Sequence, residues 1–92
     1  MTSFRVEFEK VVVSATIENN DVTISVVSGS DVYQKVFDEY NMDRFQYIKD
    51  CVEGKENHQF RIMELNGRLK LWFNTIEGDV CSNFIMYVID KL

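Results

Sequence analysis

The segment that decides the fold is residues 60–73, FRIMELNGRLKLWF, in which two alternating runs flank Asn66-Gly67. An Asn-Gly pair favours a type I′ turn, because both residues tolerate the positive φ that this turn demands. After the turn, Leu69, Leu71 and Phe73 occupy every second position. This period is typical of a strand with one buried face. The segment is therefore predicted to form a β-hairpin.

The apolar pattern changes character in the segment that follows, residues 80–90, which begins after the turn signal at residues 77–79. Both alternating sets of positions are apolar there: Phe84, Met86 and Val88 form one set, and Ile85, Tyr87 and Ile89 form the other. A strand of this kind is either central and covered on both faces, or it has one face that awaits a partner.

Upstream of the hairpin, residues 42–53 are predicted to form the one clear helix. Its apolar stripe consists of Phe45, Ile48 and Val52, flanked by Met42, Tyr47 and Cys51. The spacing of the stripe follows the helical period. We expect Asn41 to cap the first turn and Gly54 to end the helix in a left-handed conformation.

The N-terminal part alternates with period two almost from the start. Residues 4–8 read as a half-buried strand, and residues 10–28 as a hairpin that turns at Asn19-Asn20. Residues 31–40 fit one face of a helix as well as they fit a strand, so the pattern alone leaves both open. No linker, repeat or low-complexity tract interrupts the chain, and residues 1–92 are predicted to be one domain.

Composition limits the chemistry that the chain can carry. The 92 residues have a formal net charge of −5 and contain a single histidine, His58, and two cysteines, Cys51 and Cys81. These residues lack zinc-ligand spacing, and the four glycines stand singly rather than in a phosphate-binding loop. Cys51 lies beside the helix stripe, where we expect it to be buried and inert. The sequence therefore predicts no catalytic, cofactor-binding or metal-ligating residues, and no enzyme.

Targeting and partner classes follow from the same composition. The apolar runs, such as residues 11–13, are too short to cross a membrane, and the first residues lack the apolar core of a signal peptide. We therefore expect an intracellular protein with reduced cysteines that does not bind a membrane. The acidic balance argues against nucleic-acid binding, although Arg61, Arg68 and Lys70 form a small basic strip.

The positive signal is an apolar surplus in the C-terminal third. We expect Met63, Trp72, Ile85 and Tyr87 to alternate away from the buried set Leu69, Leu71 and Phe73, with Lys70 beside them. Trp72 has two interpretations. It packs in a second core layer, or it is an exposed anchor for a protein partner, since Trp combines a large rigid apolar area with a polar tip. The candidate partner-binding residues are Trp72, Met63, Ile85, Tyr87 and Lys70.

The order of elements resembles the head domain shared by the end-joining DNA-repair scaffold and the centriole cartwheel protein. The matching stretches are residues 22–26 (VTISV), 32–37 (VYQKVF), 45–51 (FQYIKDC) and 84–88 (FIMYV). The resemblance implies an α+β fold, an antiparallel β-sandwich of about seven strands. The helix at residues 42–53 would be inserted between an N-terminal four-strand part and a C-terminal three-strand part. It also implies that residues 31–37 are a strand and that heads dimerise.

The chain is also similar to small uncharacterised proteins of large DNA viruses. The stretches that carry this resemblance are Cys51, Phe60-Arg61-Ile62, Asn66-Gly67 and residues 69–73 (LKLWF). It implies a viral protein, located in the host cytoplasm or the virion.

Together these observations favour a non-enzymatic interaction or structural protein, with a virion component among the options. We expect it to self-associate or to dock a protein partner through its C-terminal sheet. The alternative is a small acidic inhibitor of a host nuclease or nucleic-acid-binding protein, because a net charge of −5 steers a compact body toward a basic groove.

Overall fold

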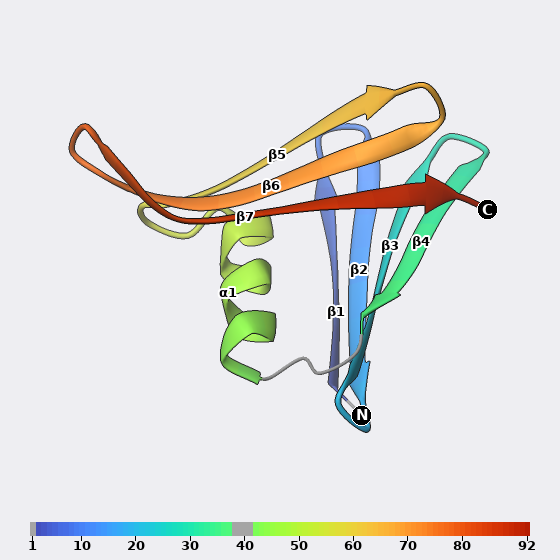
Figure 1. The fold of residues 1–92 in the computed structure, drawn as a ribbon, viewed down its shortest axis with the longest axis horizontal. Helices are drawn as coiled ribbons and strands as arrows, with labels where there is room; N and C mark the ends of the chain where they lie inside the picture. Colours follow the sequence, from blue (N-terminus) through green and yellow to red (C-terminus); the bar gives the residue numbers. More distant parts are fainter. Residues whose placement is uncertain (1, 38–41) are drawn as a thin grey trace.

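The computed structural model describes residues 2–37 and 42–92, which form seven strands and one helix (Figure 1). The elements are β1 (Thr2–Phe8), β2 (Val11–Glu18), β3 (Asp21–Ser28), β4 (Asp31–Phe37), α1 (Met42–Glu53), β5 (His58–Leu65), β6 (Arg68–Glu77) and β7 (Val80–Lys91). The prediction of a mostly antiparallel β protein with a helix between four strands and three is confirmed. The strand expected at residues 31–37 is also confirmed, and residues 38–40 lie outside the described part.

All seven strands belong to one curled antiparallel sheet in the order β1-β2-β3-β4-β7-β6-β5. The four N-terminal strands and the three C-terminal strands meet at β4 and β7, which pair at two positions, Tyr33↔Lys91 and Gln34↔Asp90. The two layers expected of a sandwich are thus connected parts of a single sheet. β1 and β5 are the two edge strands, and α1 lies within the curl, beneath β5–β7 (Figure 1).

The helix fills the concave side of the sheet. Its buried residues are Phe45, Ile48, Cys51 and Val52, which is the predicted stripe together with the cysteine. Gly54 has φ 71°, and its N–H donates to the Cys51 carbonyl over 3.1 Å, so the helix ends where the glycine predicts. Asn41, the expected cap, lies outside the described residues. None of the helices in residues 2–37 and 42–92 is both long and apolar enough to cross a membrane.

The core joins the two ends of the curl. Phe8 at the end of β1 meets Phe60 of β5 edge-to-face, with ring centroids 4.8 Å apart. The hydroxyl of Tyr33, which is buried in β4, donates to Glu64 Oε2 of β5 over 2.8 Å. Contacts therefore link strands that are far apart in the order of the sheet, and the curl is held from inside.

The predicted hairpin turns are confirmed by the backbone. Asn19 and Asn20 have φ 52° and 70°, and Asn66 and Gly67 have φ 53° and 78°. Each pair has positive φ at both central positions, the requirement of a type I′ turn. The turn at Asn66-Gly67 fixes the β5–β6 register, in which Met63 lies opposite Lys70 and Arg61 opposite Trp72.

β7 contains an irregularity that decides which of its residues face the core. Thr75 pairs with Ser82 and Phe73 pairs with Ile85, so Asn83 and Phe84 together stand opposite Asn74. Asn83 has φ 54°. One extra residue in a left-handed conformation is a β-bulge, and it shifts the register of every later pair by one. A ladder counted from Glu77↔Val80 without the bulge would place Trp72 opposite Ile85, whereas Trp72 lies opposite Met86.

Candidate protein-interaction face

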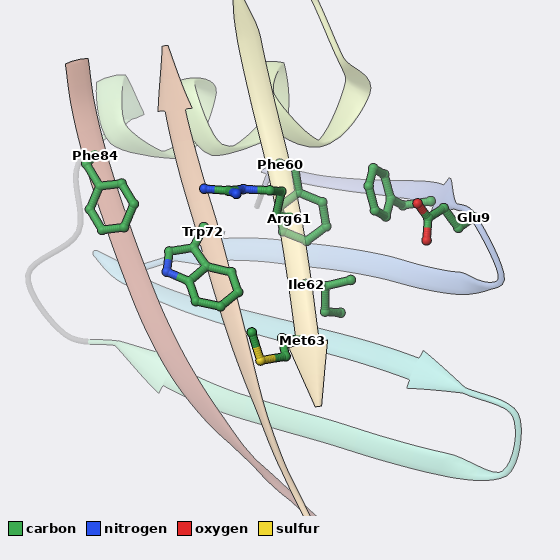
Figure 2. Close-up of a pocket in the computed structure, with 8 residues that line it drawn as sticks. Glu9, Phe60, Arg61, Ile62, Met63, Trp72 and Phe84 are labelled. Atoms are coloured by element: carbon green, nitrogen blue, oxygen red, sulfur yellow. The ribbon is translucent and has the colours of Figure 1, made fainter. Parts of the chain in front are cut away.

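The side of β5, β6 and β7 that turns away from α1 forms a surface that we call the outer face. Strand pairing arranges it in three rows: Arg61-Trp72-Met86, Met63-Lys70-Val88 and Leu65-Arg68-Asp90, with Phe84 beside the first row. Figure 2 shows Arg61, Trp72, Met63 and Phe84 on this side of the strands, with α1 behind them. The outer face therefore combines large apolar side chains with three cations and one carboxylate.

Trp72 lies in the middle strand of this face and is only partly buried. The Arg61 guanidinium lies 5.8 Å from the centre of its ring, a distance at which a cation and an aromatic face attract each other. On the other side of Trp72, Met86 of β7 is its cross-strand neighbour. Neighbours on the same sheet account for this burial, and among residues 2–37 and 42–92 no second core layer covers the ring. Of the two interpretations of Trp72, the structure supports the accessible side chain.

Large apolar side chains around Trp72 are strongly exposed. Phe84 is 55% exposed, Met63 48% and Met86 45%. Exposed apolar residues that stand singly are ordinary, whereas a contiguous group on one face is typical of a contact surface. Beside them, Met63, Trp72 and Phe84 share a hollow of about 620 Å³ with Arg61 and with residues across the edge of β5, including Phe8 and Glu9 (Figure 2).

The predicted placement of Met63, Lys70 and Trp72 on one face is confirmed, but that of Ile85 and Tyr87 is wrong. Ile85 pairs with Phe73 and Tyr87 pairs with Leu71, so both point to the concave side and pack against the core. The Tyr87 ring centroid lies 4.4 Å from that of Phe37. The bulge at Asn83 is the reason, because without it both residues would share the face of Trp72.

Sequence reasoning therefore missed Phe84 and Met86 as members of the candidate face, although it recognised that they alternate with Ile85 and Tyr87. Arg61 and Arg68 were recognised only as parts of a basic strip. The signal that identifies Arg61 is the Asn66-Gly67 turn, since counting back from the turn places Arg61 beside Trp72. For β7 the corresponding signal is Asn83, a residue that tolerates positive φ within an otherwise regular strand.

A polar cluster joins α1 to the bulge on the concave side. The Tyr47 hydroxyl lies 2.9 Å from Thr75 Oγ1 and donates to the Asn83 carbonyl over 3.0 Å. The Thr75 hydroxyl therefore donates to Tyr47, which acts to lower the pKa of that phenol, while the larger effect of burial raises it. This contact fixes the helix on the one irregular position of β7, a positioning role for Tyr47.

The titratable groups near this cluster do not form an activated nucleophile. Burial raises the pKa of the Cys51 thiol, and the thiol donates weakly to the Asn74 carbonyl over 3.8 Å. A nucleophilic cysteine requires the opposite shift. His58 is half-buried, and its Nδ1 lies 2.8 Å from the Glu56 carbonyl. Within the described part of the chain, no group of three or more His, Cys, Asp or Glu side chains is arranged to hold a metal ion.

Comparison of the chain with models of protein families and with curated proteins finds no match.

Proposed function

We propose that this protein is a non-enzymatic interaction protein that docks a protein partner through the outer face of β5–β7. The observation that carries the proposal is the row Arg61-Trp72-Met86 with exposed Phe84 and Met63 beside it, on the side of the sheet that α1 leaves open. Tryptophan and arginine are the residues most enriched among those that dominate binding energy.

The energetic reason is the apolar area that a partner would cover. Burying a fully exposed Phe or Met side chain contributes about 1.5–3 kcal/mol, and Phe84, Met86 and Met63, which are about half exposed, each contribute a corresponding fraction. Association has costs of its own, so a net affinity requires several such side chains in one place. Phe84, Met86 and Met63 meet that requirement because the bulge brings Phe84 and Met86 to the side of Trp72.

The test is selection of binders from a random peptide library, followed by two matched double variants. F84S with M86S changes the outer face, and V27S with V36S removes two exposed apolar side chains from β3 and β4. We expect the selected peptides to shift the emission of Trp72, the only tryptophan, to lose binding in the first variant and to keep it in the second. Peptides that bind both variants equally would refute the proposal.

Self-association, which the resemblance to the head-domain family implies, is examined with the same variants. Light scattering coupled to size-exclusion chromatography gives the molar mass at increasing concentration. A dimer that F84S with M86S dissociates would identify the partner as a second copy. A dimer unaffected by that variant would place self-association on a different surface.

A further inference from the structure

The outer face has an excess of positive charge, whereas the chain as a whole is acidic. Its rows contain Arg61, Lys70 and Arg68 and a single carboxylate, Asp90, in a chain with a net charge of −5. Arg68 Nε lies 2.8 Å from Asp90 Oδ1, so these two charges compensate each other. Within residues 2–37 and 42–92, neither Arg61 nor Lys70 takes part in an ion pair. The face therefore presents two uncompensated cations.

The two cations alternate with the apolar side chains. Arg61 stands beside Trp72 in one row, and Lys70 stands between Met63 and Val88 in the next. Glu9 lines the far side of the hollow at the edge of β5, and no ion pair joins it to Arg61 (Figure 2). A ligand that covers the apolar residues must therefore also approach Arg61 and Lys70.

A second copy of the chain is a poor occupant of this face. In a two-fold symmetric contact the same patch meets itself. Arg61 and Lys70 would then face the cations of the other copy, and the one carboxylate within the three rows, Asp90, is already paired with Arg68. Like charges brought together at an interface oppose association.

A nucleic acid also fits less well than a protein. Electrostatic affinity for a strand grows with the number of phosphates that cations neutralise, and two free cations neutralise too few to hold a strand at physiological salt. Trp72 and Phe84 are two rings on which bases can stack, but Met63, Met86 and Val88 around them offer no stacking surface, and the net charge of −5 repels the backbone.

We infer that the outer face receives an acidic, apolar segment of a partner protein. Its carboxylates pair with Arg61 and Lys70, and its apolar side chains cover Trp72, Met86 and Phe84. This inference rests on the proposed function and adds the chemistry of the partner. Charge complementarity sets the orientation and the association rate, and burial of the apolar residues supplies the affinity.

The test uses defined probes on the full chain. The first probe is a short peptide in which Glu alternates with Leu and Phe; the second has Lys in place of Glu; the third is single-stranded oligodeoxythymidylate. Calorimetry measures affinity, and the emission of Trp72 reports whether the probe reaches the outer face. The variant is R61E with K70E, and the matched control is R5E with K10E, two exposed cations on β1 and its turn, which changes the net charge by the same amount.

We expect the Glu peptide to bind and to shift Trp72 emission, and added salt to weaken it. R61E with K70E should lose at least about tenfold in affinity and prefer the Lys peptide, while the control stays within about twofold. Equal losses in both variants, or no binding of the Glu peptide to the unaltered protein, would overturn the inference. Equal binding of the Lys peptide would overturn it and leave the proposed function standing. Tighter, competing binding of the oligonucleotide would replace it with nucleic-acid recognition.

Discussion

The two cysteines both contact Asn74 of β6 but differ in exposure. Cys51 on α1 is buried and directed to the Asn74 carbonyl, whereas Cys81 on β7 is exposed and accepts a hydrogen bond from Asn74 Nδ2 over 3.2 Å. The prediction that Cys51 is buried is confirmed. Both cysteines are free in the structure.

This difference predicts the response to a thiol reagent at neutral pH. Burial raises the pKa of Cys51 and blocks access to it, so a disulfide reagent should modify one thiol rapidly, that of Cys81, and the second only after unfolding. C81S should abolish the rapid phase, and C51S should keep it. A rapid phase that persists in C81S would contradict the placement of Cys51.

At the scale of elements, the bulge in β7 is the feature with the largest effect on the candidate face. Asn83 adopts φ 54°, and the Tyr47 hydroxyl holds its carbonyl. A β-branched residue in this conformation carries a steric cost that Gly avoids and Asn partly avoids. The irregular position is therefore specified by its own residue as well as by α1.

Substitution at the bulge tests this account. N83G should leave the free energy of unfolding unchanged or raise it, and N83V should lower it by about 1–2 kcal/mol, because valine resists positive φ. The control is S82V, one residue earlier, where Ser82 forms a regular pair with Thr75. Denaturant titration measures all three variants. Equal stability of N83V and S82V would show that the conformation of residue 83 does not matter.

The elements were more predictable than their relative register. Asn66-Gly67 and Asn19-Asn20 predict tight turns because these residues tolerate positive φ. Each tight turn then fixes the pairing of the two strands that it connects. Met63, Lys70 and Trp72 belong to one such hairpin, so they could be placed on one face. Phe84 and Met86 could not, because both faces of β7 are apolar and the shift arises at Asn83, a single residue without a glycine beside it.

At the scale of the whole molecule, the curl depends on contacts between strands that are not neighbours. β4 and β7 pair at only two positions, so the two halves of the sheet need further links. The Tyr33 hydroxyl, on β4, reaches Glu64 on the edge strand β5. The hydrogen bond to Glu64, followed by burial, raises the pKa of Tyr33 to about 12.

This link predicts a loss of stability at alkaline pH. In the unfolded chain Tyr33 ionises near its ordinary pKa of about 10, whereas the folded protein keeps the proton up to about 12. The unfolded state then binds fewer protons, so the free energy of unfolding decreases as pH rises through this window. The contribution is complete below about pH 10.

Denaturant titration across the alkaline range checks the prediction. The decline should be shallower in Y33F, which has no proton to lose at this position, and also in E64Q, which removes the charge that opposes ionisation. A slope in Y33F equal to that of the unaltered protein would show that another group controls alkaline stability.

The register of β7 has a further consequence for how the chain folds. Because Phe84, Met86 and Val88 are as apolar as Ile85, Tyr87 and Ile89, a ladder slipped by one residue would also fill the concave side with hydrophobic side chains. That competing topology removes the Arg68–Asp90 ion pair and turns Asp90 inward, and it leaves Tyr47 without its carbonyl acceptor. The polar contacts of Tyr47 and Asp90 thus favour the native register of β7 over a slipped register that buries a similar amount of apolar surface. We expect a variant that loses either contact to populate the slipped register during folding.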